Sequence, residues 1–230
     1  MPTILLFLFQ LILFAIGIIG PWRDANATGR LPRIVRMLLS FSLVVAAFEI
    51  WFGGAKQATY AQWVAFGMLA SFIGDLIMAK LIPLPNRLIG GMIAFGIAHV
   101  FYITAYVGAS VESLDRWIVG LVVGLGFYAV ISIGGWFALI RNPQKDRATN
   151  IGALVYGMLV GTMAAFALGL ASALGGGFWL TAVGGLLFIV SDFIIGITDI
   201  RGIKIKNAND WIWLTYVAGQ AGIIYAGAIY

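Results

Sequence analysis

Long apolar stretches alternate with short polar segments from one end of the chain to the other. Each stretch is about twenty residues long, which is the length an α-helix needs to cross the hydrocarbon core of a bilayer. The stretches fall at about residues 3–20, 34–52, 60–79, 88–107, 117–140, 150–173, 178–198 and 211–230. This pattern predicts an all-α, polytopic membrane bundle of eight transmembrane helices, in a single domain that covers residues 1–230.

Composition strengthens this prediction and narrows the possible chemistry. The 230 residues are 62% hydrophobic and 10% charged, whereas a soluble domain is about half apolar and about a quarter charged. The first apolar stretch lacks the basic start of a signal peptide, so we expect it to be a retained helix. The chain has no cysteine and a single histidine, so we expect no disulfide, no metal site and no cofactor. Carboxylates, one imidazole and hydroxyls remain as catalytic groups.

Basic residues gather on alternate connections between the apolar stretches. Of the 14 lysines and arginines, all but Lys56 and Arg116 lie on the first, third, fifth and seventh connections or at the adjoining helix ends. Basic connections face the cytoplasm, so we expect both termini on the opposite side of the cell membrane. The sequon at Asn26 then lies on the cytoplasmic side and is a chance match. Topology therefore explains the net charge of +5, and we expect no nucleic-acid partner.

Ionisable side chains inside the apolar stretches are the strongest functional candidates, because a charge is costly there. The four are Glu49, Asp75, His99 and Asp192. Asp75 and Asp192 lie at similar depth, about 6 Å and about 9 Å from the cytoplasmic ends of their helices at a rise of 1.5 Å per residue. Neither aspartate is followed by a basic residue at i+4, so we expect the two to share a functional site. The alternative is that each bonds a hydroxyl such as that of Ser71 or Ser191, and Glu49, near an outer helix end, is expected to be structural.

Several polar residues are expected to surround the two aspartates. His99 and Tyr102 share one face of the helix predicted at 88–107, at i and i+3. Tyr216 and Gln220 share a face of the last helix at i and i+4, and Tyr156 lies at comparable depth. We expect these five side chains to line a pocket in the cytoplasmic half of the bundle, although each is also a candidate for an ordinary core role.

The two halves of the chain are weakly similar. Residues 74–78 in the third apolar stretch read GDLIM, and residues 191–195 in the seventh read SDFII. The pair Phe95/His99 in the fourth stretch parallels Tyr216/Gln220 in the eighth. We hypothesise two parallel repeats of four helices, related by a pseudo-two-fold axis. Glycines four residues apart, Gly120/Gly124 and Gly157/Gly161, are typical of closely packed membrane helices.

Five segments together resemble the YhhN family of membrane proteins, whose characterised members are lysoplasmalogenases. They read SFIGDLIMA, GMIAFGIAHVFYITAY, ALVYGMLVGTMAAFAL, VGGLLFIVSDFIIGI and WLTYVAGQAGIIYAGAIY, in the order of the family. The resemblance implies that Asp75 and Asp192 match the aspartates regarded as catalytic in that family. The family often has a Lys-Pro pair where this chain reads LPRIVRMLL, so Arg33 or Arg36 is expected to take its place.

The resemblance implies hydrolysis of the vinyl ether bond of a lysoplasmalogen, which gives a fatty aldehyde and a glycerophospho headgroup. Protonation of the alkenyl carbon creates an oxocarbenium-like cation, so the reaction suits one carboxylic acid and one carboxylate. We expect Asp75 and Asp192 to divide these roles, in an order that the sequence leaves open. His99, Tyr156 and Gln220 are expected to orient water or the ether oxygen.

Two arginines near helix ends are candidates to bind the headgroup of the substrate. Arg87 and Arg201 are candidates to hold the phosphate, and ordinary cytoplasmic charge is the alternative. The expected partners are the lysophospholipid substrate and membrane lipids, with the oligomeric state left open. A non-catalytic lipid-binding or scaffold subunit and a proton-coupled transporter stay open as other functions. A transporter would need polar side chains along both halves of its path, so the clustering near one side favours a one-sided pocket.

Overall fold

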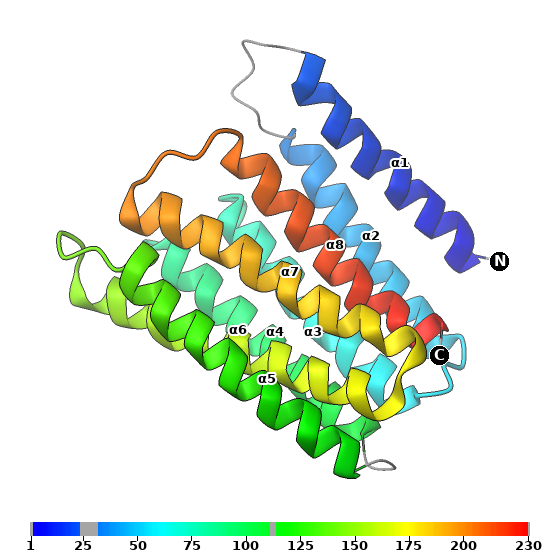
Figure 1. Cartoon of the computed structure of the whole chain (residues 1–230). Coiled ribbons are helices and arrows are strands. Elements are labelled where there is room, and N and C mark those ends of the chain that lie inside the picture. The colour runs from blue at the N-terminus through cyan, green and yellow to red at the C-terminus, as the bar shows by residue number, and fades with distance from the viewer. Residues whose placement is uncertain (1, 24–31, 111–113, 230) are drawn as a thin grey trace.

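The structure is a computed structural model that describes residues 2–23, 32–110 and 114–229 (Figure 1). The sequon at Asn26 falls outside these ranges. The helices are α1 Pro2–Arg23, α2 Arg33–Phe52, α3 Ala58–Met78, α4 Arg87–Ala109, α5 Leu114–Gly135, α6 Arg147–Leu174, α7 Trp179–Ile195 and α8 Ala208–Ile229. The described residues form no strand, so the all-α prediction is confirmed for them.

Three short turns of other helix types extend these helices. A π-helical turn, η1 Trp136–Ile140, continues α5, and a second one, η3 Gly196–Arg201, continues α7. A 3₁₀ turn, η2 Gly176–Phe178, precedes α7. Both π-helical turns lie at the same end of the bundle, and they contact each other there.

Seven helices are long and apolar enough to cross a membrane, namely α2, α3, α4, α5 with η1, α6, η2 and η3 with α7, and α8. Their outward faces carry large apolar side chains, such as those of Val119, Val122 and Val130 on α5. The chain is therefore an integral membrane protein. In the part of α1 whose side chains are described, the apolar run Ile4–Ile16 is too short to count as a membrane span. The first expected span, at 3–20, therefore stays a prediction.

Six helices form a closed ring, and two lie outside it (Figure 1). Around the ring, α2 packs on α3, α3 on α4, α4 on α6, α6 on α7, α7 on α8, and α8 on α2. Helix α5 packs on α6 and α1 on α2, at opposite edges of the bundle. The interior is filled by side chains that are almost fully buried, among them Tyr60, Tyr102, Tyr106, Phe178 and Phe188.

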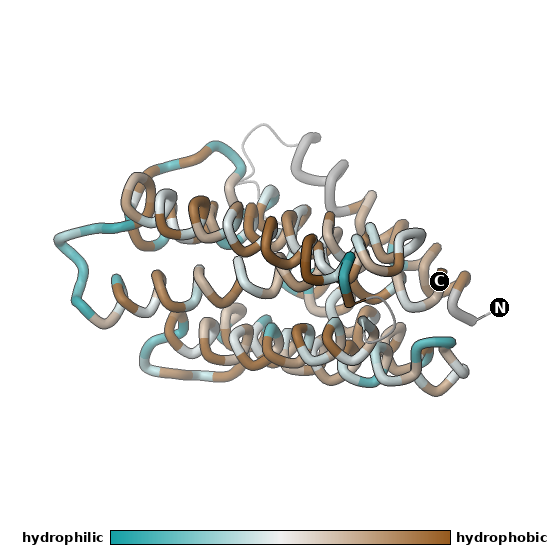
Figure 2. The backbone as a smooth tube through the Cα atoms, turned by 60° about the horizontal axis from the view of Figure 1, so that its bottom comes forward, coloured by the Kyte–Doolittle hydropathy of each residue, from teal (hydrophilic) through white to brown (hydrophobic). Residues whose placement is uncertain are grey.

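The third, fifth and seventh connections, which carry basic residues and lie within the described chain, meet at one end of the bundle. There Arg201 donates to the carbonyl of Arg141, and Arg87 pairs with Asp199. Figure 2 shows apolar residues along the helices and hydrophilic residues in the connections. The first turn of α1 and the last turn of α8 lie at the opposite end (Figure 1). Charge is thus segregated along the helix axes, and which end faces the cytoplasm stays a prediction.

An aspartate and an asparagine cap two helices at this basic end. Asp146 accepts hydrogen bonds from the backbone N–H and the hydroxyl of Thr149, at 2.8 and 2.6 Å. These bonds hold the pKa of the Asp146 carboxyl below its usual value. The side chain of Asn86 accepts from the backbone N–H groups of Leu88 and Ile89 in the same way. Both caps satisfy donors that the first turn of a helix leaves open.

Glycine permits close approach at most, but not all, of the positions where the sequence suggested it. A Cβ on Gly124 would lie 2.9 Å from the Cα of Ala165, and one on Gly161 would lie 2.6 Å from the Ser132 hydroxyl. A Cβ on Gly157, in contrast, would meet no atom within 4 Å. Close packing is therefore the wrong explanation for Gly157, which faces open space.

Replacing Gly219 by alanine is expected to loosen the contact between α7 and α8. The new Cβ would lie 2.8 Å from the carbonyl oxygen of Gly184, which is backbone and can move only with its helix. We expect the free energy of unfolding to fall by about 1–3 kcal/mol, as in other overpacked contacts, measured by reversible unfolding in mixed micelles. Gly126→Ala on α5 is the control, because its Cβ meets nothing within 4 Å; equal effects would contradict the expectation.

Candidate functional site

Asp75 lies near the end of α3 in a polar setting made by two other helices. Its carboxylate accepts hydrogen bonds from the hydroxyl of Ser40 on α2 and from that of Tyr216 on α8, the latter at 2.7 Å. The side chain of Arg36, one turn before Ser40, is also buried, with its guanidinium 5.4 Å above the ring of Trp213. Asp75 itself is 5% exposed. The carboxyl group thus joins α2, α3 and α8.

Asp192 lies on α7 and is connected to a second set of polar side chains. The hydroxyl of Tyr156 on α6 donates to the Asp192 carboxylate at 3.0 Å and lies 3.3 Å from Nε2 of His99 on α4. Because the tyrosine proton goes to Asp192, Nε2–H of the neutral imidazole donates to the tyrosine oxygen. Nδ1 of His99 has no hydrogen-bond partner among the described residues. The chain of contacts from His99 through Tyr156 to Asp192 therefore joins α4, α6 and α7.

The remaining predicted residues lie between these two sets. The hydroxyl of Tyr102 donates to the side-chain carbonyl of Gln220 at 2.7 Å and lies 3.4 Å from the hydroxyl of Ser71. The Phe188 ring lies edge-on to both the His99 ring, at 4.8 Å between centroids, and the Tyr216 ring, at 5.3 Å. Apolar and aromatic packing thus holds the two carboxyl groups on separate helices in fixed positions.

The hydroxyl partners that the sequence suggested for the aspartates are not the ones observed. Ser71 contacts Tyr102, and Ser191 donates to the carbonyl of Ile212. Asp75 is instead bonded by Ser40 and Tyr216. Neither of the two serines nearest the aspartates in sequence satisfies a carboxyl group, so these carboxyls are not explained by local capping.

Both aspartates line one cavity of about 150 Å³ at the basic end of the bundle. Arg36, Arg87 and Asp199 also line it. The other lining residues are Met78, Ala79, Phe95, Phe188, Ser191, Ile195, Asn209, Ile212, Trp213 and Tyr216. Three carboxyl groups, those of Asp75, Asp192 and Asp199, and two guanidinium groups thus line one small space, and the guanidinium groups are suited to bind an anionic group there.

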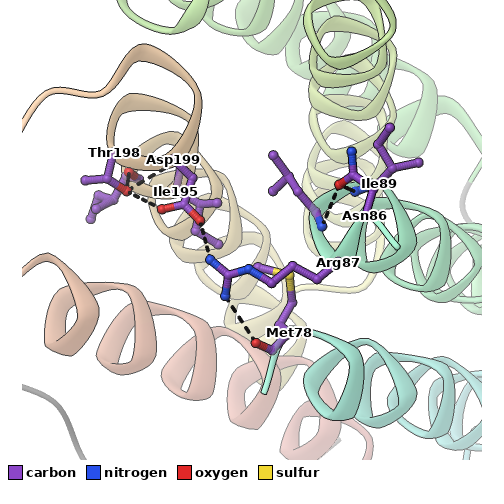
Figure 3. A network of polar contacts seen from close by, with 9 residues as sticks. Met78, Asn86, Arg87, Ile89, Ile195, Thr198 and Asp199 are labelled. Carbon is purple, nitrogen blue, oxygen red and sulfur yellow. Dashed lines mark hydrogen bonds and ion pairs between the residues drawn. The ribbon is translucent and has the colours of Figure 1, made fainter. Parts of the chain in front are cut away.

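Arg87 is among the residues that line this cavity, and Figure 3 shows its polar contacts. Its guanidinium pairs with the Asp199 carboxylate at 3.3 Å and donates to the carbonyl of Met78 at 3.4 Å. The Asn86 cap fixes the start of α4 immediately before it. Both members of the ion pair are more than one third exposed, so solvent weakens their attraction.

Of the two arginines expected to bind the headgroup, one lines the cavity and the other does not. Arg87 lines the cavity, whereas Arg201 donates to the carbonyl of Arg141 and is not among the residues that line the cavity. Arg36 takes the second position at the cavity instead. Sequence reasoning missed Ser40 and Asp199 altogether. Ser40 could have been found, because it lies one turn after Arg36 on the same face of α2.

Within the described residues, no group of three histidine, aspartate or glutamate side chains is arranged to hold a metal ion. The fold and the cavity together define a polytopic α-helical membrane protein with a carboxylate-lined cavity at one end. The chain belongs to the YhhN family, whose family model matches residues 31–227. The match covers every residue of the cavity, and it confirms the resemblance found in the sequence. No curated protein and no solved structure matches the chain.

Replacing Tyr216 by phenylalanine tests whether the Asp75 carboxyl carries a charge. We expect the free energy of unfolding at pH 7 to fall by about 1.5–3 kcal/mol, the range for a hydrogen bond to a charged group. Tyr225→Phe is a matched control on the same helix, because the Tyr225 hydroxyl donates to the neutral amide of Gln10 at 2.8 Å. Its expected cost is about 0.6 kcal/mol, the average between membrane helices. Reversible unfolding in mixed micelles measures both, and equal losses would show a neutral Asp75.

Proposed function

We propose that the protein is a membrane-embedded hydrolase of the lysoplasmalogenase type, which cleaves the vinyl ether bond of alkenyl lysophospholipids. The products are a fatty aldehyde and a glycerophospho headgroup. One observation carries the proposal: Asp75 and Asp192, from different helices, line a single cavity that Arg36 and Arg87 also line. Membership of the YhhN family supports the same reaction.

The reaction needs one proton donor and one base of the protein next to the vinyl ether. A carboxylic acid transfers its proton to the outer carbon of the C=C–O unit, and the ether oxygen stabilises the resulting cation. Water then adds to the carbon next to the oxygen while a carboxylate accepts its proton. In the hemiacetal so formed, the carboxyl group that took the proton of water gives it to the glycerol oxygen, and the C–O bond breaks. The other carboxylate accepts the proton of the hemiacetal hydroxyl, which releases the aldehyde and the free hydroxyl of glycerol and restores one acid and one carboxylate.

The two carboxyl groups have different surroundings, and we use this difference to assign the acid and the base. Asp75 accepts hydrogen bonds from Ser40 and Tyr216, and the buried side chain of Arg36 lies one helical turn before Ser40. Asp192 accepts one side-chain hydrogen bond, from Tyr156, within the described chain. A carboxyl group that accepts fewer hydrogen bonds retains its proton more readily. We therefore assign Asp192 as the acid and Asp75 as the base that activates water.

The neighbouring polar residues position these groups. His99 holds the hydroxyl of Tyr156, which in turn orients the carboxyl group of Asp192. On the other side, Tyr216 orients Asp75. Tyr102 and Gln220 bond each other one layer deeper and form the polar floor below Phe188.

The arginines of the cavity suit the phosphate of the headgroup. Arg36 and Arg87 both line it, and guanidinium groups bind phosphate oxygens in pairs. We therefore propose that the headgroup lies at the basic end of the bundle. By the positive-inside rule that end faces the cytoplasm, so the substrate would enter from the cytoplasmic leaflet.

The pattern of helix contacts also supports two parallel repeats of four helices. In the first half, α2 packs on α3 and on α8; in the second half, α6 packs on α7 and on α4. The bond from Ser40 to Asp75 runs from the second helix of its half to the third, as does the bond from Tyr156 to Asp192. The repeat would place the two carboxyl groups across a pseudo-two-fold axis.

The packing beyond the polar floor disfavours a proton-coupled transporter. Tyr60, Tyr106 and Phe178 are fully buried there, and the Tyr60 ring lies 6.1 Å from that of Tyr106 and 5.2 Å from that of Phe178. A transport path would have to cross this packed aromatic layer. The function that best fits is therefore a reaction in a pocket open toward one side.

Asp75→Asn and Asp192→Asn are expected to reduce aldehyde release from an alkenyl lysophospholipid by at least about 10²-fold each, because an amide keeps the shape but cannot exchange the proton. Release is measured with purified protein in detergent micelles. Glu49→Gln, a half-buried carboxyl group outside the cavity, is the control and should keep full activity.

Three outcomes of this assay separate the alternatives. Full activity in either asparagine variant would remove that aspartate from the mechanism. If the wild-type protein releases no aldehyde but still binds the lipid, the protein is a lipid-binding or scaffold subunit. If it neither releases aldehyde nor binds the lipid, the proposed substrate is wrong.

Single cysteines test which end of the bundle faces the cytoplasm, since the natural chain has none. We expect Lys56→Cys, in the α2–α3 connection, to react with a membrane-impermeant maleimide on intact cells. Lys145→Cys, at the basic end, should react only after the membrane is permeabilised. The reverse pattern would invert the proposed orientation.

A further inference from the structure

A second cavity, of about 70 Å³, lies beside the first and has a different chemical character. It is enclosed by α4, α6, α7 and the two π-helical turns, and its wall is made mainly of apolar side chains such as those of Met92, Ile189 and Phe193. The polar side chains on it are Ser132, Tyr156 and Asp192. The Ser132 hydroxyl donates to the carbonyl of Gly157, so this polar group is already satisfied. We call this space the chain chamber.

The chain chamber adjoins the cavity of the two aspartates. Met78, Phe95, Asp192 and Ile195 line both spaces. The Asp192 carboxyl group therefore lies at the boundary between an apolar side and a charged side. On the charged side are Arg36, Arg87, Asp75 and Asp199, which makes the pair of cavities amphipathic from one end to the other.

Two local features of the backbone keep the chain chamber open. Trp136 and Ile140 of η1, and Gly196 and Ile200 of η3, line it; π-helical turns often occur at functional sites. The second feature is Gly157, which also lines the chamber and where a Cβ would meet nothing within 4 Å. Any larger side chain at this position would project into free space rather than into a neighbouring helix.

We propose that the chain chamber binds the first few carbons of the single hydrocarbon chain of the lysophospholipid, next to the bond that is cleaved. This proposal rests on the proposed function. The chamber of about 70 Å³ has room for about five water-sized groups at roughly 10–15 Å³ each, and a methylene group is of similar size. The chamber therefore selects an unbranched, apolar chain close to the ether, and the rest of the chain lies beyond it.

The arrangement also gives a reason for single-chain substrates. One apolar chamber adjoins Asp192, while the space on the other side is lined by two arginines and two aspartates. A second hydrocarbon chain would have to be placed among these charges, which is costly. The hydrogen on the chain side of the double bond comes from Asp192, and the headgroup side faces Asp75.

A photoreactive lipid tests this placement without depending on catalysis. The probe is a saturated alkyl-ether lysophosphocholine, which has no vinyl ether to hydrolyse, with a diazirine at chain carbon 4 or at the chain end. After irradiation, peptide mass spectrometry locates the adducts. We expect the carbon-4 probe to label Met92, Phe95 or Ile189, and the chain-end probe to label residues outside the chamber.

Filling the chamber provides the matched variants. Gly157→Leu is expected to reduce carbon-4 labelling of the chamber at least tenfold, and Gly157→Ala by a smaller factor. Gly126→Leu adds the same side chain on the lipid-exposed face of α5, where a Cβ meets nothing within 4 Å, and should leave labelling unchanged. Gly157→Ala serves as the deciding variant if the leucine variant does not fold.

The outcomes distinguish this proposal from the proposed function. Carbon-4 adducts spread over outward-facing residues such as Val122 and Val130, and unaffected by the substitutions at Gly157, would overturn the chain chamber. Labelling as expected together with an absence of aldehyde release from the vinyl ether substrate would leave the chamber in place and refute the hydrolase.

Discussion

A carboxyl group inside a helical bundle in a bilayer is withdrawn from bulk water, so hydrogen-bond donors for it must come from neighbouring helices. Asp75 meets this requirement with Ser40 from α2 and Tyr216 from α8. Helices α2 and α8 are far apart in sequence, and they are the pair that closes the ring. The hydrogen bonds that reduce the cost of burying this carboxyl group thus also join α2 and α3 to α8.

Asp192 shows a complementary solution, with fewer donors and more aromatic packing. Its partner Tyr156 is held by His99, and Phe188 packs between the His99 ring and the Tyr216 ring. The polar groups are therefore connected in two short series on either side of one phenylalanine. The two chemically equal side chains thus have different hydrogen-bond partners, and the proposed division into acid and base rests on this difference.

Much of the fold could be predicted because the lengths of the apolar stretches and the positions of the basic residues can be read directly along the sequence. The apolar stretches and the alternation of basic connections are sufficient to place the helices and the shared end of Asp75 and Asp192. The rotation of each helix could not be predicted in the same way. Membrane helices are apolar on nearly all faces, so nothing indicated that Arg201 points to Arg141 or that Gly157 borders a cavity rather than a helix.

The ion pair between Arg87 and Asp199 has a consequence for how an anion reaches the cavity. Because Asp199 already neutralises this guanidinium, an incoming phosphate would displace one carboxylate and take over its partner. Entry beside Arg87 is then an exchange of anions, in which the attraction gained by the ligand is offset by the attraction lost inside the protein. The strength of phosphate binding to Arg87 then depends on how much better phosphate fits the guanidinium group than the Asp199 carboxylate does, and not on charge alone. Dissolved salt weakens the Arg87–phosphate pair and the Arg87–Asp199 pair together.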